Sequence, residues 1–148
     1  MSQIFDQLTL DMKESMKNKD KNRLTTIRMA MSAIKQKQID EKIDITDEIV
    51  IAVITKMIKQ RQDSYNQYMQ ADRAELADGE KREIEVLTKY MPKQLSDEEV
   101  VAIVQKAIED VGATSMKEMG KIMANVKKEL AGRTDMSKVS DIVKSNLV

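Results

Sequence analysis

Residues that interrupt helices are scarce along this chain. Its 148 residues include four glycines and one proline. Glycine and proline are the strongest breakers of regular structure, and a fold with many strands and tight turns needs more of them. The scarcity therefore predicts long helices, and we expect an all-α fold. Hydrophobic residues make up 41% of the chain, which is enough apolar material to build a core.

Hydrophobic spacing predicts four helices in the first part of the chain. The first covers residues 2–18, with Ser2 as a suitable N-cap, and the second follows a polar break and extends toward Ile39. The third begins after Thr46, a suitable N-cap, and the fourth covers about residues 74–90. We expect these apolar side chains to face inward: Ile4, Leu8, Met12 and Met16 in the first helix, and Leu76, Ile84, Leu87 and Met91 in the fourth.

A helix stop and a helix start lie close together after the fourth helix. Pro92 disfavours helical backbone at the residue before it. Ser96 and Glu99 then have the spacing of a capping box at the start of the next helix. We therefore place a boundary here, between a four-helix N-terminal domain (1–92) and a small three-helix C-terminal domain (93–148).

Three shorter helices are expected in the second part. The first covers residues 97–111 and ends at Gly112. The second begins at Ser115, where Glu118 completes another capping-box pattern, and ends at Gly132. The third begins near Asp135. A three-helix unit of this size has a thin hydrophobic core.

The residues that most often perform catalysis or bind metals are missing. The chain has no cysteine and no histidine, so it lacks thiol nucleophiles, thiolate ligands and the usual general base. Gly79 lies among acidic residues and not before a Lys-Ser pair, so it does not belong to a phosphate-binding loop. We expect no catalytic residues, no metal and no cofactor.

Neither a membrane span nor a secretion signal is expected. The longest apolar run, residues 49–54, is far shorter than the roughly 20 residues that a spanning helix needs. The first residues lack the basic and apolar regions of a signal peptide. We therefore expect a soluble, cytoplasmic protein without membrane contact.

Arg61 falls on the apolar stripe of the third helix, where a charge needs a partner. One interpretation is a structural ion pair with an acid of the fourth helix, Glu80 or Glu83. The alternative is a binding residue that lines a groove between helices, together with Tyr65 and Arg73. The residues alone do not decide between these interpretations.

Basic residues gather near the C-terminus although the whole chain has a net charge of zero. Lys117, Lys121 and Lys128 fall within about 40° of one another if they share one helix. Such a face suits phosphate groups, but it can also be an ordinary exposed surface. With few aromatic residues for base stacking, any RNA contact would favour backbone and shape over base sequence. No DNA partner is expected. The candidate RNA-binding residues are Lys93, Lys117, Lys121, Lys127, Lys128, Arg133, Lys138 and Lys144.

Several segments, in order, resemble the YqeY family. They are Lys59–Ser64, Arg73–Leu76, Glu83–Ser96, Met119–Met123 and Ala131–Asp135, and the most specific part is Tyr90–Ser96. The family is similar to the tail of the GatB subunit of the glutamine-dependent tRNA amidotransferase. The resemblance implies a four-helix N-terminal domain followed by a small helical C-terminal domain.

The resemblance also implies binding of tRNA, and it carries a family label of carbon–nitrogen ligase activity with glutamine as amido donor. Residues matched to the GatB-like tail are Lys121, Gly132, Arg133, Asp135, Lys138 and Lys144. We therefore predict a tRNA-binding accessory protein, with an aminoacyl-tRNA synthetase or an amidotransferase component as a possible protein partner. The alternative is a helical module that docks on a translation or amidotransferase component without RNA contact.

Overall fold

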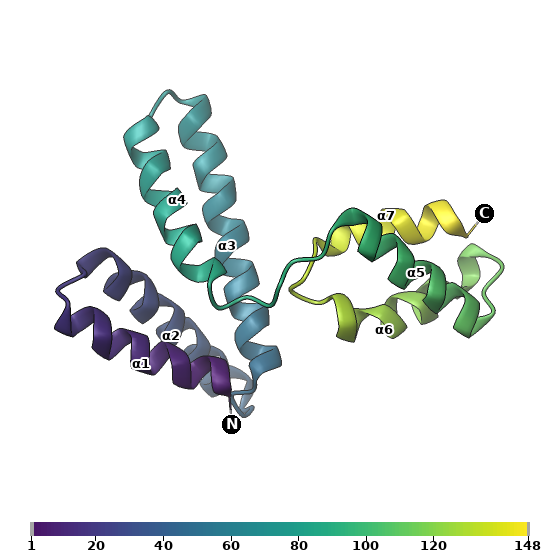
Figure 1. Ribbon diagram of the computed structural model, residues 1–148, viewed down its shortest axis with the longest axis horizontal. Helices are drawn as coiled ribbons and strands as arrows, with labels where there is room; N and C mark the ends of the chain where they lie inside the picture. Colours follow the sequence, from purple (N-terminus) through teal and green to yellow (C-terminus); the bar gives the residue numbers. More distant parts are fainter. Residues whose placement is uncertain (1, 148) are drawn as a thin grey trace. The chain divides into compact units, whose positions relative to one another are not determined.

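The computed structural model describes residues 2–147, and in this range regular structure is helical throughout, with seven α-helices and no strand (Figure 1). The expected all-α class is confirmed. Contacts within the chain divide it into two compact units, with the division in the sequence between Met91 and Pro92. We describe each unit by itself.

The N-terminal unit consists of two helical hairpins: α1 (Gln3–Lys17) with α2 (Lys21–Glu41), and α3 (Asp47–Gln70) with α4 (Ala74–Thr88) (Figure 1). The expected caps are present. The Ser2 hydroxyl accepts a hydrogen bond from the Phe5 amide at 3.0 Å, and the Thr46 hydroxyl accepts one from the Ile49 amide at 3.3 Å. These bonds satisfy amides that have no partner within their own helix, so local sequence sets where both helices begin.

Apolar residues from all four helices form the core of this unit. Leu8 of α1, Ile34 of α2 and Leu87 of α4 are fully buried together with Val50 and Ile54 of α3. Each such side chain contributes about 1.5–3 kcal/mol relative to an exposed one. This shared core fixes the two hairpins against each other at one end of the unit.

Polar contacts join the helices of the same unit. The Asp47 carboxylate, in the first turn of α3, accepts hydrogen bonds from the Ser2 hydroxyl at 2.6 Å and the Ile4 amide at 3.1 Å. These bonds lower the pKa of Asp47. Tyr90 is buried after α4 and donates its hydroxyl to Asp11 of α1 at 2.5 Å. The end of α4 is thereby tied to the first helix.

Two apolar residues expected to face inward are exposed. Leu76 is 39% exposed in the first turn of α4, and Met16 is 50% exposed in the last turn of α1. Both lie near an end of their hairpin, where no further helix covers the apolar stripe. Helical spacing predicted which residues share the apolar face of α1 and of α4, but it could not show where the neighbouring helix packed on that face ends.

The C-terminal unit consists of α5 (Asp97–Val111), a short 3₁₀-helix η1 (Met116–Glu118), α6 (Met119–Leu130) and α7 (Met136–Asn146). The capping box of Ser96 and Glu99 is confirmed, and Gly112 ends α5 with a φ of 71°. The core of this unit consists of Val100, Val104, Ala107, Ile122, Val126, Leu130, Val139, Val143 and Leu147.

The expected capping box at Ser115 does not form, and the α-helix does not begin there. Ser115 makes no side-chain capping bond, and η1 precedes the first residue of α6. The Glu118 carboxylate accepts from the Thr114 amide at 3.5 Å instead of from the expected cap residue. A capping-box pattern needs α-helical backbone between its two members, and here the intervening residues take the tighter 3₁₀ turn.

Candidate functional site

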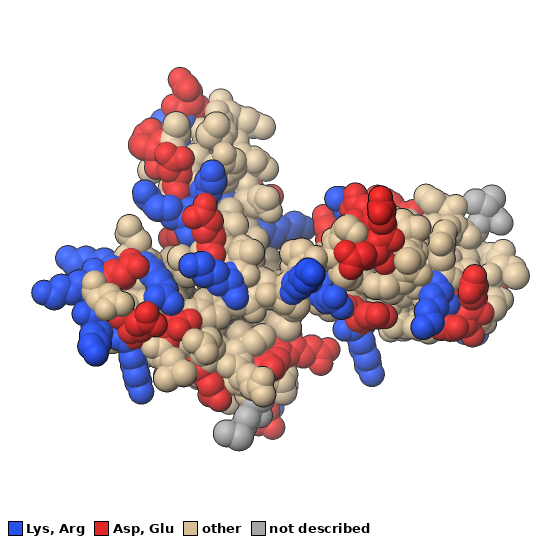
Figure 2. Space-filling view, viewed as in Figure 1, with Lys and Arg blue, Asp and Glu red and all other residues tan. Residues whose placement is uncertain are grey.

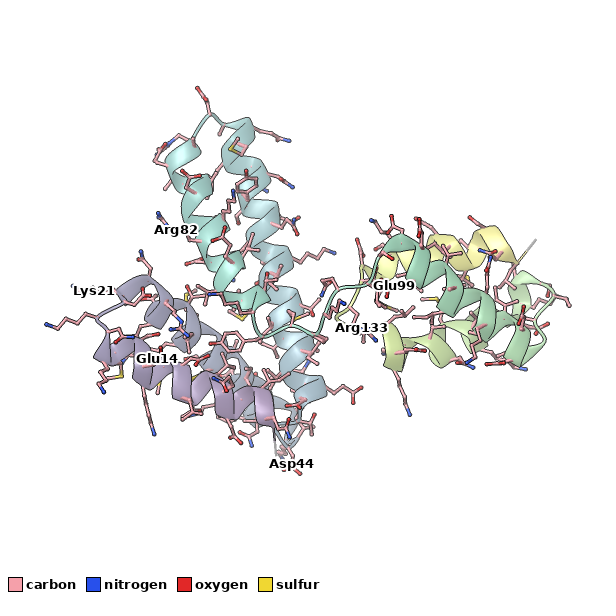
Figure 3. All side chains as sticks on the ribbon, viewed as in Figure 1. Glu14, Lys21, Asp44, Arg82, Glu99 and Arg133 are labelled. Atoms are coloured by element: carbon pink, nitrogen blue, oxygen red, sulfur yellow. The ribbon has the colours of Figure 1, made fainter. Side chains whose placement is uncertain are left out.

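A crevice opens between the two hairpins of the N-terminal unit, with a volume of about 380 Å³. The surface recedes between these hairpins in Figure 2, and Figure 3 shows Arg82 projecting from α4 toward this side. Residues from α2, α3 and α4 contribute to it. We call it the α2–α4 crevice, and it is lined by Asn22, Thr25, Thr26, Tyr68, Glu75, Leu76, Gly79, Glu80, Arg82, Glu83 and Val86.

A network of charges lies beneath the crevice. The Arg61 side chain is 10% exposed and donates from Nε to Glu83 Oε2 at 3.0 Å. It also donates from Nη1 to the Met57 carbonyl at 3.2 Å. The structural ion pair is therefore present, with Glu83 and not Glu80 as the partner. This network satisfies a guanidinium group that burial would otherwise strongly destabilise.

Glu80 lies in the same crevice without such a partner. Burial raises the pKa of its carboxyl group, and the neighbouring charge of Glu83 raises it further, while Arg61 acts in the opposite direction. Within the described part of the chain no hydrogen bond to Glu80 contributes to this balance. Glu80 is thus a partly desolvated acid with unused acceptor capacity on its carboxylate.

Gly79 lies in the middle of α4 and lines the crevice. Its backbone does not require glycine, because its φ is not in the left-handed region. The packing does not require glycine either: a Cβ placed there would have its nearest contact, the Arg82 side chain, at 4.0 Å. Glycine in a helix interior costs about 1 kcal/mol relative to alanine. The protein therefore keeps open space here at the expense of helix stability.

A second depression, of about 500 Å³, lies between α2 and α3 in the same unit. Its floor includes the apolar side chains of Ala33, Val53 and Met57. Charged residues such as Lys37, which pairs with Glu41 at 3.7 Å, lie along its sides. We call this depression the α2–α3 groove.

The residues predicted to line a groove lie beside the crevice rather than in its lining. Each of the two arginines pairs with an acid that does line the crevice: Arg61 with Glu83, and Arg73 with Glu75 at 3.0 Å. Tyr65 is half-buried on α3 outside the crevice lining. Sequence reasoning missed Gly79 as a lining residue, although an unexplained glycine within a helix was a usable signal.

The predicted RNA-binding residues are all in the C-terminal unit, but α-helical geometry joins only some of them. Lys121 and Lys128 share α6, as expected. Lys117 belongs to the 3₁₀-helix η1, where the rotation per residue is not the 100° of an α-helix. The expected alignment of Lys117 with Lys121 and Lys128 therefore does not apply. Lys127 also lies on α6 and Lys144 on α7, and all of these lysines are exposed.

Two of the predicted phosphate contacts already have partners within the chain. Arg133, labelled in Figure 3, donates to the Lys93 carbonyl at 3.3 Å and to the Glu129 carbonyl at 3.5 Å. Lys138 pairs with Asp97 at 3.5 Å. The Leu95 amide donates to the Arg133 carbonyl at 2.8 Å, so this arginine fastens the segment before α5 to the loop after α6. Both acidic and basic side chains lie on the face of this unit visible in Figure 2.

Residues 2–147 contain no cluster of three or more acidic side chains placed to hold a metal ion. Across the same range, none of the helices combines the length and the apolar character needed to cross a membrane.

Comparison with known proteins then assigns the chain to a family. The family model described as Yqey-like protein matches residues 5–147. The chain belongs to the YqeY family. Its relatives include three yeast proteins named altered inheritance of mitochondria protein 41, mitochondrial. The one from Vanderwaltozyma polyspora is 34% identical over 119 residues, which cover 76% of this chain and 64% of the relative.

The Kluyveromyces lactis protein is 39% identical over 107 residues, covering 70% of this chain and 58% of the relative. The Candida glabrata protein is 33% identical over 135 residues, which cover 89% of this chain and 71% of the relative. The matched region therefore spans less than two thirds of the length of the first two relatives.

These relatives correct two expectations about this YqeY-family chain. The expected tRNA-binding function related to GatB is contradicted, because the curated relatives are named for inheritance of mitochondria. The expected cytoplasmic location is contradicted as well, because the same names describe mitochondrial proteins. The structure offers a physical reason for the first error: the guanidinium group of Arg133 serves backbone carbonyls, and Lys117 lies outside the helix that was expected to align the lysines.

Proposed function

We propose that this YqeY-family protein is a helical interaction module whose N-terminal unit binds a segment of a partner protein in the α2–α4 crevice. The crevice combines exposed apolar surface, from Leu76, with hydrogen-bonding groups that include the Glu80 carboxylate. Binding sites on proteins typically have this composition of apolar surface and a few polar groups.

Gly79 is the observation that carries the proposal. Neither its backbone conformation nor its packing needs glycine, yet an alanine here would favour the helix by about 1 kcal/mol. A side chain at this position would project into the crevice. The glycine is explained if another molecule occupies that space, because stability is then exchanged for room to bind.

We infer in addition that the two compact units are separate domains, with four helices before Met91 and three α-helices after Pro92. Each unit has its own buried cluster of apolar residues. Separate domains fold alone, so fragments 1–91 and 92–148 should each give a cooperative thermal transition. A fragment that lacks a transition while the full chain retains it would contradict this division.

An aminoacyl-tRNA synthetase or an amidotransferase component is the class that the family resemblance suggests, and we retain it as a proposal. The test begins with affinity capture on the full chain, from extracts treated with ribonuclease, followed by purification of each captured protein and measurement of its affinity by calorimetry.

Substitutions at one position make this test specific. Gly79→Leu fills the crevice while raising helix propensity, so it should keep the fold and weaken binding at least tenfold. Gly79→Ala gives a similar gain in propensity with much less added volume, so it should weaken binding far less. Lys81→Leu places the same side chain on an exposed position of α4 outside the crevice lining and should leave binding unchanged.

Two results would count against the proposal. Equal affinity of the Gly79→Leu variant and the unmodified chain would show that the crevice is not the binding surface. Capture that depends entirely on RNA would show that no protein segment is recognised directly.

A further inference from the structure

The α2–α4 crevice and the α2–α3 groove lie along one face of the same helix. With 100° of rotation per residue, seven of the eight α2 residues that line them, from Asn22 to Asp40, fall within about 60° of one direction, and Glu41 at the end of the helix lies about 100° from it. The core residues of α2, such as Ile27 and Ile34, are centred roughly 130° away. At a rise of 1.5 Å per residue, the lined face of α2 is about 27 Å long.

Met29 lies along α2 between the residues that line the crevice and those that line the groove. Met29 lies midway along this face, is 44% exposed, and its sulfur lies 3.8 Å from the Arg61 guanidinium. Methionine is unbranched and adapts easily to a neighbouring surface. Rotation of the Met29 side chain would release this sulfur contact and open the space between the crevice and the groove without movement of the backbone.

The walls of this joined surface favour a helix over an extended peptide. All of its lining elements are helices, whose backbone groups are bonded internally, so an extended peptide would find no edge strand to pair with. A docked helix satisfies its own backbone. Small residues, Gly79 in the crevice and Ala33 and Ala52 in the groove, allow the axis of such a helix to approach closely.

The negative charge of Glu80 favours a basic residue in the segment that binds here. Within residues 2–147, Glu80 is the crevice acid with no ion pair or side-chain hydrogen bond, since Glu83 is bonded to Arg61 and Glu75 to Arg73. A lysine or arginine opposite Glu80 would compensate its partial desolvation, because a charge-assisted bond in a recessed site is stronger than one in open solvent.

We propose that the crevice and the groove together bind one amphipathic α-helix of a partner protein, about 18 residues long, with a basic residue opposite Glu80. This inference rests on the proposed function and adds the form, length and charge of the bound segment. The apolar stripe of that helix would contact Met29 at its centre and Leu76 at the crevice end.

A displayed library of random 20-residue helical sequences, selected on the full chain, tests the inference. Selected sequences should contain apolar residues at spacings of three and four together with an excess of lysine and arginine. Synthetic peptides of these sequences would then be titrated by fluorescence anisotropy against the unmodified chain and four variants.

The variants separate the two halves of the surface. Gly79→Leu in the crevice and Ala52→Gln in the groove should each weaken binding about tenfold, because one helix contacts both. Glu80→Gln should weaken binding about threefold to tenfold for basic peptides. Glu85→Gln, an exposed position of α4 outside the crevice lining, serves as the control that leaves affinity unchanged.

Each other outcome has a definite meaning. Peptides that bind with unchanged affinity to Ala52→Gln, or that lack basic residues, would overturn this inference and leave the proposed function standing. Failure to select any peptide would count against both. Self-association of the chain that Gly79→Leu and Ala52→Gln both abolish, measured by sedimentation, would assign the surface to a second copy and overturn the inference.

Discussion

Replacement of Arg61 by methionine should destabilise the N-terminal unit by about 2–3 kcal/mol. Breaking a buried ion pair by removal of one partner costs about 3–5 kcal/mol, because the remaining charge stays uncompensated. The side chains of Arg61 and Glu83 are 10% and 32% exposed, so solvent relieves part of that cost. Methionine retains the apolar bulk of the arginine, which limits the loss from packing.

The three tyrosines of the chain make this effect measurable in one unit. Tyr65, Tyr68 and Tyr90 all lie in the N-terminal unit and the chain has no tryptophan, so tyrosine fluorescence reports unfolding of this unit alone. With a urea dependence of roughly 2 kcal/mol per molar, the midpoint should fall by about 1–1.5 M. Unfolding of the C-terminal unit makes no contribution to the signal.

A double-mutant cycle with Glu83→Gln tests the reasoning itself. Residues in direct contact couple by about 0.5–3 kcal/mol, and we expect about 1 kcal/mol here because Glu83 is partly exposed. Arg61→Met should also raise the pKa of Glu80 further, since the guanidinium charge lowers it in the unmodified protein. Additive effects of the two substitutions, or a midpoint shift below about 0.2 M, would refute this account of Arg61.

Three further substitutions probe the polar contacts of the two units. Burial and the bond to Asp11 raise the pKa of Tyr90, so the stabilisation from this side chain should be complete below pH 10 and decrease as the pH rises above 10. In Tyr90→Phe this contribution to the alkaline loss of stability should be absent. Hydrogen bonds lower the pKa of Asp47, so the stability that its carboxylate contributes should be complete above about pH 4 and lost under stronger acid. The Asp47→Asn variant should lose about 1 kcal/mol of unfolding free energy at neutral pH. Asp44→Asn, in the preceding loop, serves as the control that should not lose it. Arg133→Ala should lower the thermal midpoint of the C-terminal unit and increase hydrogen exchange at the Leu95 amide, and unchanged exchange would show that its side chain does not hold this segment.

Features that depend on neighbouring residues in the sequence were predictable. Ser2, Thr46 and Ser96 cap their helices as expected, because an N-cap bonds an amide two or three positions away. Ser115 departed from the pattern because the residues after it form a 3₁₀ turn. The same change of helix type removed Lys117 from the face it was expected to share with other lysines.

Features that depend on where whole elements stop were not predictable from spacing. The apolar character of Leu76 predicted burial, but its exposure follows from the absence of a covering helix at that end of α4. Similarly, Arg133 has the sequence context of a phosphate ligand, while its contacts are carbonyl groups brought close by the fold. Gly79 was the available signal for the crevice, because a glycine that neither the backbone nor the packing requires needs another explanation.

Amide chemical shifts of the isotopically labelled full chain, recorded during titration with a selected helical peptide, test the central claim most directly. We expect the largest changes at crevice residues such as Thr25, Gly79 and Glu80, with little change in the C-terminal unit. Changes concentrated at Lys121 and Lys128 of α6, with the crevice signals unmoved, would contradict it and transfer the binding surface to the C-terminal unit.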